Sequence, residues 1–173
     1  IDRRMPWIVR GERFVPRFSG RFEGIADPVV LPEDYVSLEL GNPDVAYLTA
    51  DGRIVGRADG LTTLIARSGD ALAVTVLRVG AQSDSVTLGA LVGLEPYPDA
   101  VTLSTDGGTR QILLLDFDGR PDDLAARPAQ FFSSNQAVAT VDADGLIRAV
   151  GAGRATITVI RDGADARVEV LVA

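Results

Sequence analysis

The sequence has 173 residues and a net charge of −7, with 24 acidic side chains against 17 basic ones. Such an acidic chain lacks the basic surface that binds a phosphate backbone, which argues against nucleic acid as a partner. Every basic residue is Arg, and the absence of His and Cys excludes a Ser–His triad, a thiol nucleophile, a zinc–thiolate site and a disulfide framework.

The chain opens on Ile1 rather than Met, so we expect a processed or excised piece of a larger protein. Trp7 is expected to pack under the first part of the fold. The early segment is rich in arginine, which indicates either a solvated strand face or contact with an anionic polymer or a neighbouring domain. The residues concerned are Arg3, Arg4, Arg10, Arg13, Arg17 and Arg21.

An internal repeat follows at an offset of 93 residues. Residues 42–69 and 135–162 are identical at nine of 28 aligned positions, against about two expected by chance. After a slip of one residue, Val74, Val76 and Leu77 also match residues 168, 170 and 171. The chain is therefore predicted to be a duplicated unit, with one domain over 1–80, a linker over 81–90 and a second domain over 91–173.

Each unit is predicted to consist of short strands. In the second, the run 111–117 is almost entirely apolar, 156–160 is β-branched, and 167–172 alternates apolar with charged residues. Asp-Gly pairs at 144–145 and 162–163 favour tight turns because glycine accepts a positive φ angle. Helix signals are poor, and the best candidate is a single turn over 122–127. Turn signals at this spacing predict an all-β sandwich, and no stretch is long and apolar enough for a transmembrane helix.

The segment SSNQAVATVDADGLIRAVGAGRATITV, residues 133–159, resembles the signature of group 2 bacterial Ig-like domains. Upstream, 101–113 resembles the opening of that family, and 8–14 takes the same place in the first unit. The resemblance implies two Ig-like β-sandwich domains in tandem. The first unit departs from the pattern because Leu38-Glu39-Leu40-Gly41 replaces the aromatic-Ser-Ser entry and few residues precede Trp7, so its first strand is expected to be truncated or supplied from elsewhere.

Clustered carboxylates over residues 116–123 raise the question of a calcium site, since calcium takes six to eight oxygen ligands. The alternative is that Asp116 ends a strand, Asp118-Gly119 forms a turn and Asp122 caps a short helix. We favour the second interpretation because the spacing matches no complete calcium loop. The pairs Asp51-Gly52 and Asp144-Gly145, the latter with Asp142, lie at equivalent hairpins, and turn chemistry explains them without an ion.

Other candidate sites are weak. Ser104, Ser133 and Ser134 have no His to act as a base, and the Gly-rich pieces lack the lysine of a phosphate loop. A small sandwich leaves little cleft for a glycosidase carboxylate pair. Phe131 and Phe132 either stack on a sugar or, as we favour, place one ring in the core and leave the other half-exposed.

We therefore predict no catalytic residues, no cofactor and no metal site. The resemblance implies a non-catalytic module at the cell surface or outside the cell, acting as a stalk or spacer and contacting neighbouring domains of a larger parent protein. The alternatives are a module that binds a glycan or a surface protein through polar loops, with or without calcium, and an accessory piece of a larger enzyme or phage particle.

Overall fold

A computed structural model describes residues 1, 3–22, 24–81, 94–116 and 118–173. The predicted all-β class is confirmed. The described residues contain no α-helix, and their one helical element is a single 3₁₀ turn, η1, over Glu33–Tyr35. No helix within these ranges is long and apolar enough to cross a membrane. Apart from Ala81, the predicted linker lies outside the described residues.

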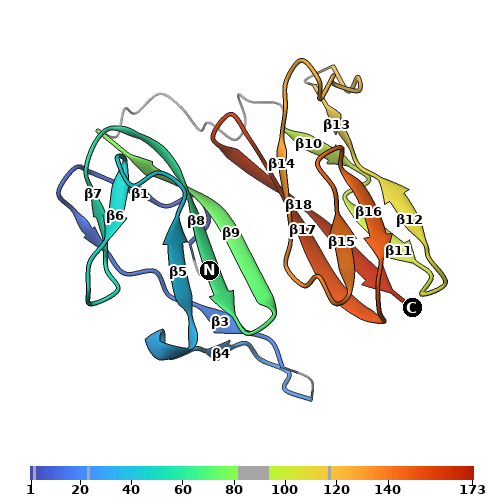
Figure 1. Ribbon diagram of the computed structural model, residues 1–173, viewed down its shortest axis with the longest axis horizontal. Helices are drawn as coiled ribbons and strands as arrows, with labels where there is room; N and C mark the ends of the chain where they lie inside the picture. The colour runs from blue at the N-terminus through green and yellow to red at the C-terminus, as the bar shows by residue number, and fades with distance from the viewer. Residues whose placement is uncertain (2, 23, 82–93, 117) are drawn as a thin grey trace. The chain divides into compact units, whose positions relative to one another are not determined.

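The described residues form two compact units, and the strands of the first are β1 to β9 (Figure 1). One sheet has the order β1-β9-β8-β5, a second has the order β2-β7-β6, and β3 pairs with β4 alone. The bounds are β1 Trp7–Ile8, β2 Arg13–Phe14, β3 Ser19–Gly20, β4 Val29–Val30, β5 Ser37–Leu40, β6 Ala46–Leu48, β7 Ile54–Gly56, β8 Gly60–Ser68 and β9 Ala71–Val79.

The second unit repeats this plan with β10 to β18. Its sheets have the orders β11-β18-β17-β14 and β12-β16-β15, and β10 pairs with β13. The bounds are β10 Glu95–Tyr97, β11 Ala100–Leu103, β12 Thr109–Gln111, β13 Leu113–Leu115, β14 Gln130–Ser133, β15 Ala139–Val141, β16 Leu146–Ala149, β17 Gly153–Arg161 and β18 Ala164–Val172. No counterpart of β10 occurs among the described residues ahead of Trp7.

The repeat seen in the sequence extends over strands beyond residues 42–69 and 135–162. Four strands of the first unit, β5, β6, β8 and β9, begin and end exactly 93 residues before β14, β15, β17 and β18. The predicted slip of one residue is therefore wrong. At a constant offset, Thr75, Leu77 and Val79 correspond to Val168, Val170 and Val172, and all six side chains are buried. The slip arose because residues 74–77 are all buried, so their apolar pattern matches more than one register.

Each unit is an Ig-like β-sandwich whose core is filled from both of its main sheets. In the second unit, Ile157 and Val168 of the four-stranded sheet lie in one buried cluster with Ala139 and Ile147 of the three-stranded sheet. In the first, Leu64 and Leu77 meet Ala46 and Ile54 in the same way. The alternation predicted for the last strand is confirmed, since Val168, Val170 and Val172 are buried and Arg167 and Glu169 are exposed.

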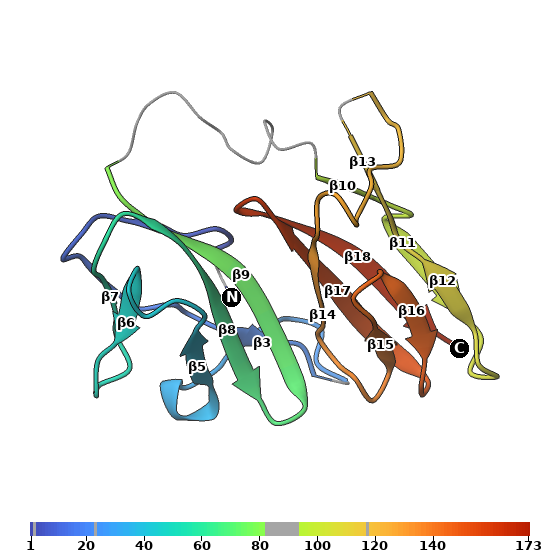
Figure 2. The same ribbon diagram turned by 45° about the horizontal axis from the view of Figure 1, so that its top comes forward.

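The long hairpin β17–β18 forms the centre of its sheet, as Figure 2 shows from a second direction. Its two strands pair over nine residues each and join at Asp162-Gly163, where both residues have positive φ angles of 49° and 78°. These angles match the tight turn predicted from the Asp-Gly pair. The predicted strand over 111–117, by contrast, is divided between β12 and β13 at Ile112, whose N–H donates to the carbonyl oxygen of Gly145 at 2.9 Å.

The Ser pair of the family-like segment ties β14 to its neighbours. Ser133 is buried, and its hydroxyl donates to the carbonyl oxygen of Ala139 at 2.6 Å. The Ser134 hydroxyl accepts the backbone N–H of Thr156 at 2.8 Å. The first unit has Leu40 and Gly41 at these two positions, and a side chain on Gly41 would lie 2.2 Å from the hydroxyl oxygen of Thr63. The first unit therefore lacks the two serine hydrogen bonds at these positions, and Thr63 approaches the backbone of Gly41 closely instead.

One glycine in each unit is required by a close approach. Gly153 starts β17 with a φ of 144°, and a Cβ there would lie 2.9 Å from a methyl group of Val138. Gly60 starts β8 with a φ of 155°, and its Cβ would lie 3.0 Å from the equivalent methyl group of Val45. Both the backbone angle and the valine exclude a side chain at this position.

We predict that Gly153→Ala destabilises the second unit by about 2–3 kcal/mol, because backbone strain and a clash with Val138 act together. The matched control is Gly107→Ala, where φ is also positive (80°) but nothing lies within 4 Å of the new methyl group. The control should cost about 1 kcal/mol. Urea unfolding measures the free energy of unfolding of both variants. Equal decreases in the two would show that the contact with Val138 does not restrict this position.

Candidate functional site

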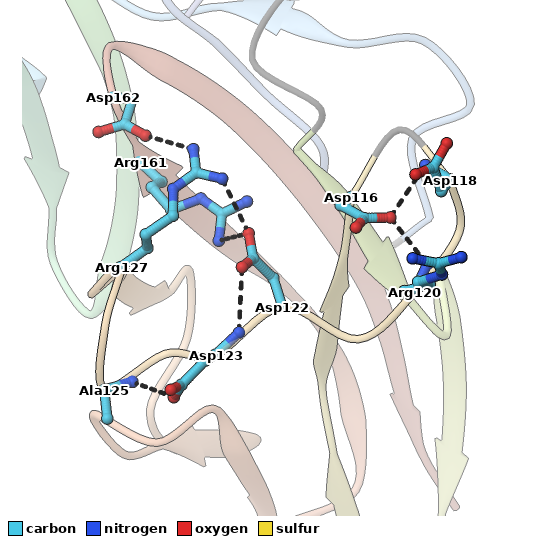
Figure 3. Close-up of polar contacts among 9 residues, drawn as sticks. All are labelled: Asp116, Asp118, Arg120, Asp122, Asp123, Ala125, Arg127, Arg161 and Asp162. Carbon is cyan, nitrogen blue, oxygen red and sulfur yellow. Dashed lines mark hydrogen bonds and ion pairs between the residues drawn. The ribbon is translucent and has the colours of Figure 1, made fainter.

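The connection between β13 and β14 contains the clustered carboxylates Asp116, Asp118, Asp122 and Asp123 (Figure 3). Asp116 lies directly after β13, and its Oδ1 accepts the backbone N–H groups of Asp118 and Arg120, both at 2.9 Å. The N–H of Gly119, with a φ of 72°, donates to the carbonyl oxygen of Asp116 at 3.0 Å. This is the turn predicted for Asp118-Gly119, and it uses the Asp116 carboxylate internally.

Asp122 faces the end of β17 rather than a helix. Its Oδ2 lies 2.9 Å from Nη1 of Arg161, whose side chain is almost fully buried, and 3.0 Å from Nη1 of Arg127. Figure 3 shows the two guanidinium groups converging on this one carboxylate. A buried guanidinium requires such a partner, because an isolated buried charge is strongly unfavourable.

Arg127 extends the network to the turn of the long hairpin. Its Nη2 donates to Oδ2 of Asp162 at 2.8 Å. This hydrogen bond, and then the charge of Asp122, raise the pKa of Arg127. The four side chains Asp122, Arg127, Arg161 and Asp162 form what we call the Asp122 network. It fixes the connection between β13 and β14 to the turn of β17–β18.

The predicted helix cap at Asp122 is therefore wrong. The segment 122–127 forms a turn rather than a helix, closed by one bond from the N–H of Arg127 to the carbonyl oxygen of Asp123 at 2.9 Å. Within it, Asp123 accepts the backbone N–H of Ala125 at 2.9 Å, and Asp122 Oδ1 accepts only the N–H of the next residue, Asp123, at 3.0 Å. The guanidinium of Arg161 attracts the Asp122 carboxylate more strongly than a backbone amide does.

This arrangement leaves the acidic segment poorly suited to calcium. Asp116 accepts turn N–H groups, Asp122 accepts two guanidinium groups, and Asp123 accepts an N–H, so their oxygens are directed at donors. Within the described ranges, no three acidic side chains converge as metal ligands. The contacts of Asp116 are those of the turn interpretation, whereas Asp122 forms ion pairs in place of the expected helix cap.

The equivalent hairpin turns at Asp51-Gly52 and Asp144-Gly145 also use their polar side chains internally. Asp142 Oδ1 accepts the N–H groups of Asp144 at 3.1 Å and Leu146 at 2.9 Å. In the first unit Thr49 takes this place, accepting the N–H of Arg53 at 3.0 Å and donating to the Asp51 carboxylate. The bond from Thr49 is the main cause that lowers the pKa of Asp51.

The other side chains singled out in the sequence serve local packing. Trp7 is half-buried, donates from Nε1 to the carbonyl oxygen of Gly80 at 2.9 Å, and lies 5.0 Å beneath the guanidinium of Arg78. Phe131 and Phe132 are both half-buried, and Phe131 packs against the core. The Ser104 hydroxyl accepts the N–H of Asp106 at 3.2 Å. The six early arginines are exposed, and Arg10 pairs with Asp59 at 3.3 Å.

The sequence reasoning missed Arg161 and its role in the Asp122 network. A signal was present, because Arg161 follows five residues of a β-branched strand and precedes the Asp162-Gly163 turn. A charged side chain at the inner end of such a strand demands a counter-charge. The spacing to Asp122 is 39 residues, so only the fold reveals which carboxylate provides it.

Residues 118–170 match the family model described as "Bacterial Ig-like domain (group 2)". The match lies inside the second unit and includes both the Asp122 network and the family-like segment. No curated protein matches the chain.

The solved structures that resemble the chain include S-layer and hydrolase proteins. The S-layer protein SbsC, as rSbsC(31-844), is 19% identical with a TM-score of 0.36; the match covers 84% of this chain and 21% of that one. Domains 4 and 5 of the same S-layer protein are 17% identical, with a TM-score of 0.36 and coverages of 91% and 79%. An endo-fucoidan hydrolase from glycoside hydrolase family 107, MfFcnA4, is 14% identical, with a TM-score of 0.32 and coverages of 98% and 27%. The chain thus spans about a fifth of the S-layer protein fragment that it matches.

We predict that Asp122→Asn destabilises the second unit by about 2 kcal/mol, since the almost fully buried Arg161 loses an anionic partner. For a unit of this size the expected fall in Tm is of the order of 10 °C. Asp118→Asn, in the same connection but exposed, is the control and should change stability by less than about 0.5 kcal/mol. Thermal unfolding followed by circular dichroism compares the two variants, and similar Tm values would contradict a stabilising role for the network.

We also predict that Thr49→Ala raises the pKa of Asp51 toward its ordinary value, because the hydroxyl that stabilises the carboxylate is removed. A lowered folded-state pKa means that the contribution of Asp51 to stability is present above the unfolded-state pKa and is lost as the pH falls through the folded-state value. Carboxyl ¹³C titration measures the pKa directly. An Asp51 pKa that is the same in the variant and in the original chain would contradict this role of Thr49.

Proposed function

We propose that the chain is a non-catalytic structural module of a bacterial surface or secreted protein, in which two group 2 Ig-like domains act in tandem as a stalk or spacer. The match of residues 118–170 to the bacterial Ig-like family supports a bacterial origin and an architectural role. The constant offset of 93 residues between the strands of the two units supports assigning the first unit to the same family.

The observation that carries this proposal is the parallel pairing of an early strand with the last strand in each unit. In the second unit β11 pairs parallel with β18 from Ala100–Glu169 to Leu103–Val172. In the first, β1 pairs parallel with β9 at Trp7–Arg78 and Ile8–Val79. A pull on the two ends of such a pair loads all of its hydrogen bonds together, in shear. This arrangement resists tension better than one in which the hydrogen bonds open one at a time.

Additional backbone bonds extend the pair in the second unit. The N–H of Glu169 donates to the carbonyl oxygen of Asp99 at 2.9 Å, and the N–H of Ala173 donates to that of Leu103 at 3.0 Å. The N–H of Thr105 donates in turn to the carbonyl oxygen of Ala173 at 3.3 Å. The second unit therefore has the longer shear contact and is expected to be the stronger of the two.

The module would act between other parts of its parent protein, on or outside the cell. Labelling of intact bacteria with an antibody raised against the chain tests this location. Staining of intact cells or of culture medium supports it, and staining that requires permeabilised cells overturns it.

We predict that the force required to unfold the second unit depends on the direction of pull. The natural absence of cysteine allows single handles to be introduced by substitution. With Asp99→Cys and Ala173→Cys handles, the load shears β11 against β18, and the unfolding force should be severalfold higher than with Asp106→Cys and Ala173→Cys handles. The second pair lies at one end of the strands and opens the hydrogen bonds one at a time.

Single-molecule force spectroscopy makes this comparison on the same folded unit, so differences in overall stability cancel. Equal unfolding forces in the two geometries would remove the mechanical basis of the spacer function. An accessory role beside an enzyme or in a phage particle would then be the better account of the fold.

A further inference from the structure

The first unit has a surface groove of about 420 Å³. Apolar side chains line it, among them Pro16, Phe18, Leu38 and Leu48, and the exposed residues Glu33, Asp34 and Asp51 lie along it. We call it the Leu38 groove. All of its lining residues belong to the first unit and are among those described.

The duplicated unit shows what is missing from the groove. At an offset of 93 residues, Leu38 corresponds to Phe131 and Gly52 corresponds to Gly145. The ring of Phe131 lies over Gly145, 3.0 Å from the position of a Cβ there, and Gly145 is buried. Gly52 has nothing within 4 Å of the same position and is exposed. The Leu38 side chain is too short to reach the turn at Gly52, so the space that the Phe131 ring fills in the second unit is empty in the first.

A second difference enlarges the opening. Phe14 pairs with Ile54, and Arg110 pairs with Ile147, the residue that corresponds to Ile54 in the second unit. Phe14 therefore corresponds to Arg110, and the next residue, Val15, corresponds to Gln111. Gln111 Nε2 donates to the carbonyl oxygen of Asp144 at 2.6 Å and so fastens its strand to the turn. Val15 lines the groove and has no amide to make this bond. In the first unit, therefore, the smaller Leu38 replaces the ring of Phe131, and Val15 replaces the hydrogen-bonding side chain of Gln111.

The charge along the groove is negative. Glu33 and Asp34 lie on η1 and are exposed, and Asp51 lies on the opposite turn. Arg53 pairs with Asp51 at 2.8 Å and balances one of the three carboxylates. Two negative charges beside an apolar floor favour a cationic group next to an apolar one, because complementary charge stabilises the complex and selects the partner.

We propose that the Leu38 groove binds an extended segment of another protein that presents an aromatic side chain next to an arginine or lysine. The aromatic ring takes the place that Phe131 takes in the second unit, and the basic group meets Glu33 and Asp34. Insertion of a ring into a preformed apolar groove, with an adjacent charge contact, is a common means of peptide recognition.

The test is a titration of the whole ¹⁵N-labelled chain with a capped hexapeptide, acetyl-Ser-Gly-Arg-Phe-Gly-Ser-amide, followed by NMR. Saturable shifts should occur at residues 15–18, 36–38 and 48–52. Replacing Phe by Ala in the peptide should weaken binding at least tenfold, and replacing Arg by Glu should weaken it severalfold. Leu38→Phe should weaken binding of the original peptide at least tenfold, because it fills the groove as Phe131 does.

Two further variants keep the test independent of any folding defect in Leu38→Phe. The double variant Glu33→Gln/Asp34→Asn alters only exposed side chains and should remove the preference for Arg over Glu in the peptide. Phe131→Leu should open the corresponding place in the second unit and produce new peptide-dependent shifts around Gly145.

The proposal is overturned if the groove residues show no saturable shift with the peptide at concentrations of about 10 mM, a level that detects affinities of only about 3 kcal/mol. It is also overturned if Leu38→Phe, folded by its spectrum, binds as the original chain does. Shifts of the same residues that depend on protein concentration alone and vanish in Phe22→Ala would replace the separate partner by a second copy of this chain, since exposed Arg21-Phe22 carries the same chemistry.

Discussion

The architecture of both units depends on one long hairpin whose strands have neighbours on both sides. β17 and β18 pair over nine residues each, and β14 and β11 add to their outer edges. The inner face of this hairpin supplies much of the core, including Ile157 and Val168. Its start is fixed by the approach of Val138 to Gly153, and its tip by Arg127 on Asp162. Burial of this apolar face is the dominant favourable contribution to folding, and the smaller strands complete it.

Much of the fold could be predicted from the sequence because turns and alternation have local causes. The Asp162-Gly163 turn and the alternating last strand of the second unit were predicted from residue types alone. The register of β9 was not, because residues 74–77 are buried without alternation and the pattern gives no unique phase. The break in the strand at Ile112 was also missed, since it depends on a hydrogen bond to Gly145, which is distant in the sequence.

The candidate site was harder to predict for the same reason. Asp116 and Asp118-Gly119 behave as a local turn, which their spacing indicates. The role of Asp122 depends on Arg161, and no short-range pattern connects the two. The Leu38 groove is a further case, because leucine and phenylalanine are equivalent in an apolar pattern. The difference between them becomes visible only when Gly52 and Gly145 are compared in three dimensions.

Parallel pairing of β11 with β18 also determines where the polypeptide enters and leaves this part of the unit. Because the two strands run in the same direction, Asp99 lies at one end of the pair and Ala173 at the other. Entry and exit are thus separated by the length of the strands, roughly 15–30 Å for four to nine residues. Further copies can be added to such a unit without reversing the direction of the chain. A protein assembled from such units would change its length through the number of copies alone, with no change in the residues that stabilise each copy.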